Sequence, residues 1–330
     1  MNLFKRAIFF TDVHFGLKSN SRLHNQDCLN FVDFVIKTGK EQNCETCVFL
    51  GDWHNNRASL QIGTLNYSVQ AIDKLSAAFD QIIFIPGNHD EHYRDTREMN
   101  SVVWAKKYDN VRIFDEITTV DDVCITPWLV GDEHKQIKKI EAKYMFGHFE
   151  LPSFYMNAMV QMPDVGDLRR DDLKCETVFT GHFHKRQTNK NITYIGNAFP
   201  HNYADVGDDD RGCMILDWGK DPVYIAWPDA PKYRKFLLSE ILEDTDRLLL
   251  SNMYCRVEID VDISYEEATF IKEQFIPQYN LRELSLIQRT DIEEHSQTFD
   301  GEVNFESVDS IVTSHLTQLE TAQYDRQLML

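Results

Sequence analysis

Residues 82–90 carry the pattern that decides the fold, and they read Ile82-Ile83-Phe84-Ile85-Pro86-Gly87-Asn88-His89-Asp90. Four apolar residues are followed at once by a turn and by amide, imidazole and carboxylate side chains. The same arrangement of an apolar run and a polar tail recurs, with the other tails at Asp12-Val13-His14, Gly51-Asp52-Trp53-His54, Gly147-His148 and Gly181-His182-Phe183-His184. Apolar runs this short, bounded by turn-forming residues, are typical of strands that are buried on both faces.

Amphipathic stretches separate the first of these predicted strands from one another. Their apolar residues recur at spacings of three and four, as on one face of a helix, in two sets: Leu29, Val32, Val35 and Ile36, then Leu65, Val69, Ile72, Leu75 and Phe79. Alternation of strands and helices predicts an α/β layered fold. The later apolar runs at 193–195, 213–216 and 223–227 have no long helix between them, so we expect the sheet to be more antiparallel there.

The chain divides into three predicted parts. A change of composition near residues 228–231 ends a first domain at residue 230. Residues 231–290 follow as a small α+β unit without polar-tailed strands. Residues 291–330 begin with a polar, acidic stretch and continue with apolar residues at helical spacing: Phe305, Val308, Ile311, Val312, Leu316 and Leu319. Such a stripe either folds back on its own domain or lies in a groove of a partner protein.

The charge balance is strongly acidic. The chain has 34 Lys and Arg residues against 53 Asp and Glu residues, a net charge of −19. This excludes a polycation that coats nucleic acid by bulk charge. Residues 232–330 hold −11 of the charge and residues 1–231 hold −8, so more than half of it lies outside the part with the polar tails.

Three further observations concern the compartment of the protein. No apolar run is long enough to span a membrane. The apolar run that follows Lys5 and Arg6 is too short for a secretory signal peptide. Seven dispersed cysteines without an export signal are typical of reduced thiols. We therefore expect a cytoplasmic protein.

The polar tails carry the chemistry of the sequence. Each stands at the carboxyl end of a predicted strand, and in an open α/β sheet these ends share a crevice. Imidazole, carboxylate and amide groups without thiolates suit Mn²⁺, Fe or Zn²⁺. On an extended chain, residues two apart point the same way and can bind one metal, and a lone carboxylate can bridge two ions. The candidate ligands are Asp12, His14, Asp52, Asn88, His148, His182 and His184.

A structural interpretation competes with this one. A single Asp, Asn or His at the end of a strand is usually a cap or a turn residue. Five such tails in one chain, each directly after an apolar run, are difficult to explain by turn chemistry alone. The set therefore favours a metal centre over isolated turns.

The order D-x-H, G-D, G-N-H-D, G-H and G-H-x-H resembles the calcineurin-like metallophosphoesterase superfamily over roughly residues 6–217. The resemblance implies a four-layer αββα sandwich and a centre of two divalent ions, usually Mn²⁺, with Mg²⁺ as an alternative. One ion would take Asp12, His14, Asp52 and His184, and the other Asp52, Asn88, His148 and His182. His89 would help to protonate the leaving oxygen, and Asp90 would orient His89.

Residues 194–217 resemble the nuclease branch of this superfamily. Tyr194-Ile195-Gly196-Asn197-Ala198-Phe199-Pro200 precedes an acidic turn and an apolar strand, and the unit at 231–290 is similar to the DNA-facing cap of that branch. The chain is similar to SbcD-type double-strand-break repair nuclease subunits, and its compactness is typical of their T-even-like phage versions. The resemblance implies a Mn²⁺-dependent DNA exo/endonuclease of recombination and repair, a homodimer, and an SbcC-type coiled-coil ATPase partner. A phage-encoded protein would work in the cytoplasm of a bacterial host.

One position departs from the family pattern. Many of these nucleases have a histidine three residues after the bridging aspartate, whereas His54 lies two residues after Asp52. His54 either replaces that histidine in catalysis or is a bystander. On an extended strand the His54 side chain would point in the same direction as that of Asp52, which favours a role for His54 in the site.

Phosphate binding would fall to short basic loops beside the candidate ligands. These hold Lys18, Arg22, Arg57, Arg94, Arg97, Lys185 and Arg186. Two other classes of function compete with a DNA nuclease. One is a phosphatase or small-molecule phosphodiesterase that does not act on DNA, and the other is a scaffold that has lost its metals. The intact ligand set argues against the scaffold.

Overall fold

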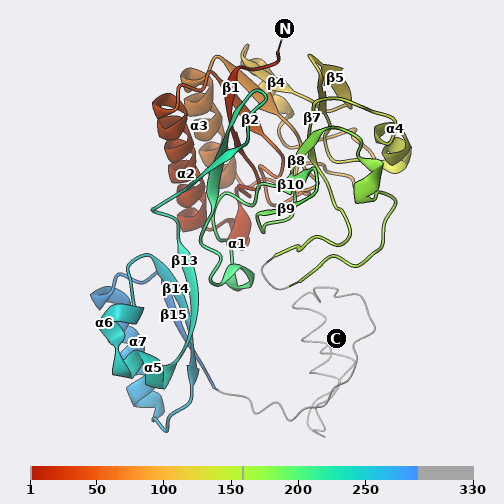
Figure 1. Ribbon diagram of the computed structural model, residues 1–330. Helices are drawn as coiled ribbons and strands as arrows, with labels where there is room; N and C mark the ends of the chain where they lie inside the picture. The colour runs from red at the N-terminus through yellow and green to blue at the C-terminus, as the bar shows by residue number, and fades with distance from the viewer. Residues whose placement is uncertain (1, 158–159, 289–330) are drawn as a thin grey trace, which may run out of the picture. The chain divides into compact units, whose positions relative to one another are not determined.

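The computed structural model describes residues 2–157 and 160–288 (Figure 1). Two six-stranded sheets form the larger part, which confirms the α/β prediction. The first sheet has, from edge to edge, β12 (Val223–Ala226), β11 (Gly212–Asp217), β1 (Arg6–Phe10), β2 (Thr46–Phe49), β3 (Gln81–Phe84) and β4 (Val111–Ile113). The second has β5 (Thr118–Val120), β6 (Val123–Ile125), β7 (Tyr144–His148), β8 (Thr177–Gly181), β10 (Ile192–Tyr194) and β9 (Gln187–Asn189).

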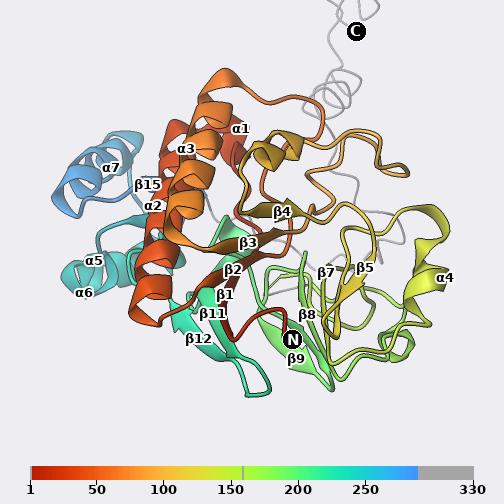
Figure 2. The ribbon, with the colours of Figure 1, turned by 90° about the horizontal axis from the view of Figure 1, so that it is seen from above.

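The two sheets lie face to face between outer layers. In Figure 2, two long helices, α2 (Arg22–Glu41) and α3 (Ile62–Ala78), cover the outer side of the first sheet. The short helix α4 (His134–Ile137) lies beyond the second sheet, where loops complete the fourth layer. Strand β1 shows how this arrangement buries both faces of a strand. Ile8 and Phe10 pack against the helices, while Ala7 and Phe9 pack between the sheets.

Short helical elements complete this part of the chain. They are α1 (Leu17–Asn20) and the 3₁₀ turns η1 (Val103–Lys107), η2 (Gly131–Glu133), η3 (Arg170–Asp172) and η4 (Tyr203–Asp205). Helix α2 begins after Ser21, whose hydroxyl accepts the His24 N–H at 3.4 Å as an N-cap.

The direction of the later strands differs in part from the expectation. β11 runs antiparallel to β1, and β12 antiparallel to β11, as expected. β10, however, is parallel to β8. The short strand β9 at the edge of the sheet carries the chain back after β8, so β10 can enter in the same direction.

A third, smaller sheet begins at Lys232. It contains β13 (Lys232–Leu237), β14 (Met253–Ile259) and β15 (Glu283–Gln288), all parallel. Its connections pass through helices α5 (Leu238–Glu243), α6 (Thr245–Leu248) and α7 (Tyr265–Gln278), whose apolar side chains share a core with the strands. Residues 1–288 form one compact unit, and the domain boundary at residue 230 remains a prediction.

An ion pair fastens this small sheet to helix α2. Both terminal nitrogens of Arg282 donate to the Asp27 carboxylate, at 2.6 and 2.8 Å, and both side chains are largely buried. The predicted linker and partner-binding helix at 291–330 lie outside the described residues. Among the described helices, none is long and apolar enough to cross a membrane.

Candidate metal centre

The polar tails all emerge at one edge of the paired sheets. Tails follow β1, β2 and β3 of the first sheet and β7 and β8 of the second. Their backbone is not extended, because Asp12, His14, Asp52 and His182 have φ values of 51°, 55°, 61° and 89°. The candidate ligands therefore converge through left-handed turns rather than through the alternation of an extended strand that we expected.

Glycines make these turns possible. A Cβ atom on Gly87 would lie 2.2 Å from Asp52 Oδ1, and one on Gly181 would lie 2.1 Å from Thr11 Oγ1. Either contact is impossible without displacement of a neighbour. The Gly residues of the G-N-H-D and G-H-x-H tails are thus required by the close approach of adjacent strand ends.

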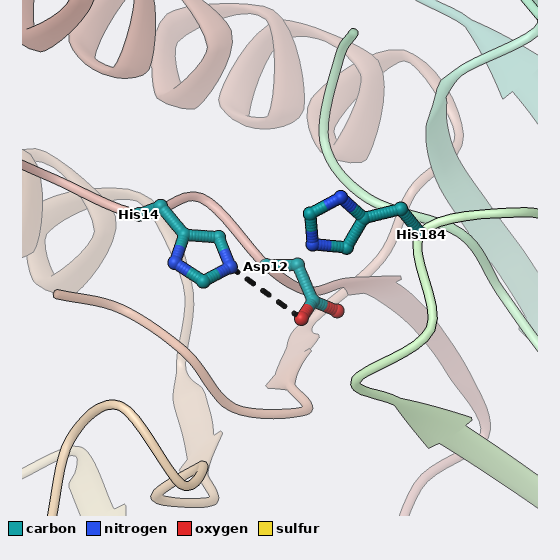
Figure 3. A group of neighbouring side chains, drawn as sticks. All are labelled: Asp12, His14 and His184. Carbon is teal, nitrogen blue, oxygen red and sulfur yellow. Dashed lines mark ion pairs between the residues drawn. The ribbon is translucent and has the colours of Figure 1, made fainter. Parts of the chain in front are cut away.

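The first donor group consists of Asp12, His14 and His184. One ligand atom from each lies within 4.8 Å of the others, and Figure 3 shows the Asp12 carboxylate between the two rings. His14 Nε2 is 3.8 Å from Asp12 Oδ1, too far for a hydrogen bond. His14 is buried, and neither of its ring nitrogens has a hydrogen-bond partner among the described residues. A buried imidazole that has no hydrogen-bond partner and lies beside a carboxylate fits the role of a metal ligand.

The second donor group consists of Asp52, His148 and His182, again within 4.8 Å of one another. Asn88 joins it, because its Oδ1 lies 3.0 Å from His148 Nε2 and 2.9 Å from His182 Nδ1. The opposite nitrogen of His148, Nδ1, donates to the carbonyl oxygen of Leu50 at 2.7 Å. That bond fixes the ring so that Nε2 faces the other donors, as second-shell carbonyls do for metal-binding histidines.

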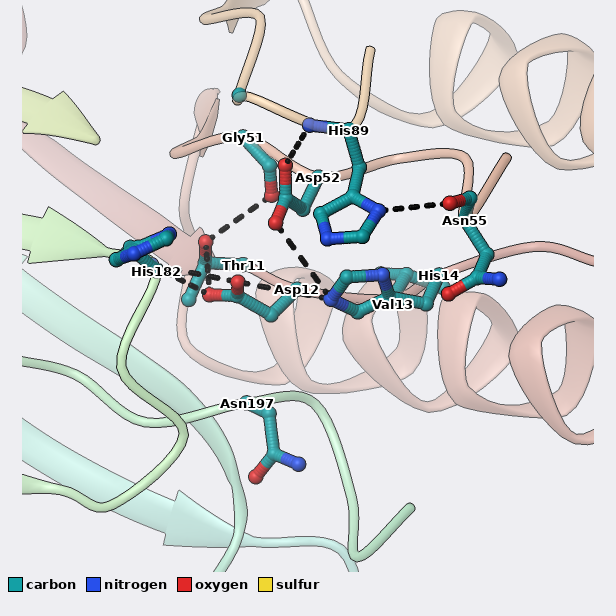
Figure 4. Close-up of polar contacts among 12 residues, drawn as sticks. Thr11, Asp12, Val13, His14, Gly51, Asp52, Asn55, His89, His182 and Asn197 are labelled. Carbon is teal, nitrogen blue, oxygen red and sulfur yellow. Dashed lines mark hydrogen bonds and ion pairs between the residues drawn. The ribbon is translucent and has the colours of Figure 1, made fainter. Parts of the chain in front are cut away.

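Asp52 connects the two groups. Its Oδ2 lies 3.6 Å from His14 Nε2 of the first group and 3.3 Å from His148 Nε2 of the second. Figure 4 shows Asp12 and Asp52 facing the His14 ring, with His182 on the opposite side. One carboxylate oxygen of Asp52 therefore lies within 4 Å of an imidazole nitrogen of each donor group.

The electrostatics of the site favour a cation. Burial alone would raise the pKa of the Asp52 carboxyl, but the charges on His148 and His89 hold it well below its usual range. Burial opposes a charge on His148 as well, yet Asp52 and Asp12 raise the pKa of His148 to about 9. The two buried carboxylates of Asp12 and Asp52 therefore favour a positive charge between the imidazole rings. The residues present fit divalent ions bound by oxygen and imidazole nitrogen.

His89 lies beside the first donor group, and one ligand atom each from His89, His14 and Asp52 lies within 4.8 Å of the others. Its backbone N–H donates to Asp52 Oδ1 at 2.8 Å, and its ring is 5.0 Å from that of His14. Nδ1 donates to the carbonyl oxygen of Asn55 at 2.7 Å, which leaves Nε2 for other chemistry. Burial lowers the pKa of His89.

The predicted role of Asp90 is wrong. Its carboxylate does not orient His89, because it accepts the backbone N–H groups of Trp53, His54 and Gly87 at 3.2, 2.9 and 2.9 Å. Asp90 instead ties the G-D tail to the G-N-H-D tail. The Asn55 carbonyl orients His89, and sequence spacing gives no sign of such a backbone contact.

His54 is also placed differently from the expectation. Its ring is fully buried, with Nδ1 2.7 Å from Ser101 Oγ and Nε2 2.8 Å from Ser68 Oγ. Ser68 Oγ also accepts the Trp53 indole N–H. Both nitrogens are thus used away from the ligands. The left-handed φ of 61° at Asp52 breaks the extended geometry that would have pointed the two side chains the same way.

Several of the basic residues are engaged inside the molecule. Lys18 reaches the hydroxyl of Tyr233 and lies 3.8 Å from the centre of the Tyr254 ring. Arg97 pairs with Glu133, and Arg186 pairs with Asp210. These three side chains make contacts within the protein, so they are less available to bind phosphate than the sequence suggested.

Sequence spacing missed two residues that touch the candidate ligands. His201 is buried, and its ring lies 5.4 Å from that of His14 and 5.3 Å from that of His184. Trp128 lies 5.0 Å from the His182 ring. Neither belongs to a polar tail. The only available sign for His201 was its place just after the stretch that ends at Pro200.

The calcineurin-like phosphoesterase family matches residues 5–186. The chain is 29% identical over 216 residues to exonuclease subunit 1 of Enterobacteria phage T4, which covers 62% of each protein, so it aligns with less than two thirds of that relative. Among solved structures, it is similar to the Pseudomonas putida nuclease MPE, with 17% identity over 55% of this chain and 62% of that one and a TM-score of 0.30. It is also similar to Yfce, a phosphoesterase from E. coli, with 14% identity over 68% of this chain and 94% of that one and a TM-score of 0.36.

The family match extends over more than half of the chain, from the strand that carries the first polar tail to the last histidine motif. Every candidate ligand lies within it. The protein therefore belongs to the calcineurin-like phosphoesterase family of metal-dependent enzymes.

Proposed function

We propose that this protein is a Mn²⁺-dependent DNA exo/endonuclease subunit that hydrolyses phosphodiester bonds with two metal ions. The observation that carries the proposal is the pair of donor groups joined by Asp52 at one edge of the sheets. The similarity to a phage exonuclease subunit supports DNA as the substrate.

The ligand sets follow from the two donor groups. Asp12, His14, Asp52 and His184 would hold one ion, and the second would be held by Asp52, Asn88, His148 and His182. Bound ions of this kind neutralise phosphate charge and lower the pKa of a water molecule. Mixed carboxylate, amide and imidazole donors suit Mn²⁺, with Mg²⁺ as the alternative.

His89 would supply the proton for the leaving oxygen. Because Nδ1 is committed to the Asn55 carbonyl, a proton for donation must be held at Nε2. Burial disfavours the charged ring, and a phosphate group nearby would offset this by its negative charge. A positioned general acid of this type contributes about 10²- to 10⁴-fold to the rate.

A partner protein would complete the enzyme. We propose an SbcC-type coiled-coil ATPase that contacts residues 291–330, a homodimer of the nuclease chain, and a DNA-facing cap formed by residues 231–290 after a catalytic domain at 1–230. The similar phage protein is named as a subunit, which supports the existence of a partner. We further propose roles in DNA recombination and repair.

The test is a Mn²⁺ nuclease assay on end-labelled duplex DNA with the unaltered chain and with His89→Ala. We expect the substitution to slow cleavage by about 10²- to 10⁴-fold while calorimetry still detects bound Mn²⁺. Hydrolysis of small phosphoesters without any cleavage of DNA, even with the ATPase partner added, would contradict the nuclease proposal and favour a phosphatase or small-molecule phosphodiesterase.

A further inference from the structure

A small pocket opens beside the second donor group, on the side of the second sheet. Its volume is about 220 Å³, and the metal-ligand candidate His148 forms part of its wall. The remaining wall is mainly apolar and aromatic, formed by Trp128, Leu129, Phe149 and Leu168. Any group seated here would lie next to the proposed position of the scissile phosphate.

Trp128 is held firmly in this wall. Its backbone N–H donates to the Pro86 carbonyl at 3.1 Å, and its carbonyl accepts a guanidinium N–H of Arg97 at 2.5 Å. Arg97 in turn pairs with Glu133, whose carboxylate accepts the Val130 N–H at 2.9 Å. The loop that carries the indole is therefore braced from behind. A loop that is held in place before its ligand arrives loses less conformational entropy on binding than a free one.

The residues that line the pocket favour a neutral occupant over a phosphate. Glu150 and Asp167 line it together with His134, and among the described residues that form its wall none is a lysine or arginine. The Glu150 carboxylate lies 4.0 Å from His182 Nε2. A neutral group with hydrogen-bonding edges suits a mainly apolar wall that also holds two acidic residues. The volume lies below the roughly 300–1,000 Å³ of sites for drug-sized ligands, so a single planar ring system fits better than a base pair.

We propose that this pocket receives the nucleobase of a nucleotide that adjoins the scissile bond, stacked on Trp128. The inference rests on the proposed nuclease function and adds to it a base-binding subsite. Stacking on an aromatic ring accepts every base, because each base has a π-face. The base must be unpaired to enter, so the bond that is cut should lie beside a frayed, looped or single-stranded nucleotide.

The experiment compares a base with no base at one position. A labelled single-stranded oligonucleotide carries one abasic nucleotide, and Mn²⁺-dependent cleavage is measured at the two bonds that flank it and at the same bonds in the intact oligonucleotide. Base–aromatic stacking corresponds to about 5- to 150-fold. We expect the unaltered chain to cleave one of the two bonds faster by a factor in that range when the base is present.

Variants then assign the effect to the pocket. Trp128→Phe keeps an aromatic face and should retain the ratio, whereas Trp128→Leu should bring it close to one. Leu129→Trp, which fills the pocket, should also lower it. Trp104→Leu is the matched control, because Trp104 is a half-buried indole whose N–H donates to the Ser101 carbonyl, outside the pocket wall. Each ratio is formed within one variant, so general damage to the metal centre cancels.

Two results would overturn the inference, and they are distinguishable. A ratio near one for the unaltered chain, or a full ratio in Trp128→Leu, refutes the base pocket and leaves the nuclease intact. If neither oligonucleotide is cut while a small phosphodiester is hydrolysed, the nuclease proposal fails and the base pocket fails with it.

Discussion

Replacement of His54 by glutamine separates a structural role from a catalytic one. In the structure His54 is a buried imidazole held between the hydroxyls of Ser68 and Ser101. Burial lowers the pKa of His54 from 6.5 to about 3. The folded protein therefore keeps this ring neutral at a pH at which the unfolded chain already protonates it.

The sign and size of the effect follow from this difference. The pKa is depressed in the folded state, so the stabilising contribution is complete above pH 6.5 and declines as the pH falls from there towards 3. Each unit is worth about 1.4 kcal/mol. At pH 5, which is 1.5 units below the unfolded value, the folded state should therefore have lost about 2 kcal/mol through this one residue.

Urea denaturation at pH 7.5 and pH 5 measures that loss. His54→Gln should be less stable than the unaltered chain at pH 7.5 by about 1–3 kcal/mol, because one serine hydroxyl loses its partner. Its further loss on going to pH 5 should be smaller than that of the unaltered chain by about 2 kcal/mol. Equal pH dependence in the two proteins would refute the neutral, buried state, and a 10²-fold or greater fall in Mn²⁺-dependent hydrolysis at pH 7.5 would return His54 to catalysis.

Three further changes test the rest of the structure. Asp52→Asn should reduce the number of Mn²⁺ ions bound in calorimetry from two to fewer than two, because it weakens the oxygen donor shared by both groups; unchanged stoichiometry would contradict a bridging role. Gly181→Ala should lower Mn²⁺ affinity by about 10- to 100-fold, since its Cβ would displace Thr11, and an unaltered titration would show that the strand ends can move apart. Arg282→Met should cost about 3–5 kcal/mol in urea denaturation by leaving the Asp27 carboxylate buried and unpaired, and the double change with Asp27→Asn should recover most of it; no recovery would mean that the loss comes from packing.

The fold was predictable from local patterns wherever burial acts on both faces of a strand. Strand β1 shows the reason, because its alternate residues enter two different cores, which removes polar residues from the run and leaves a short apolar segment. The direction of β10 was not predictable. It depends on the three-residue strand β9 at the edge of the second sheet, too short and too polar to show a periodic pattern.

The convergence of the candidate ligands was predictable from residue type and from their place after the strands, but the extended geometry that we expected there was wrong. Asp12 and His14 do approach each other, but through left-handed backbone rather than through an extended strand. The assumption of an extended strand also gave the wrong place for His54, because the left-handed backbone at Asp52 points the His54 side chain away from the ligands. Residues such as His201 reach the site only through tertiary packing, which leaves no local sign in the sequence.

The acidic net charge of the chain is compatible with its proposed DNA substrate if bound metal ions, rather than surface side chains, supply the positive charge. Lys18, Arg97 and Arg186 make contacts within the protein. Fewer basic side chains are therefore free to bind a phosphate backbone than the sequence contains in these loops. Two divalent ions would bring up to four positive charges to the edge where Asp12 and Asp52 are buried. Affinity for a phosphodiester should then depend on metal occupancy more than on surface charge. The net charge of −11 on residues 232–330 would suit the proposed partner if that partner presents a basic surface.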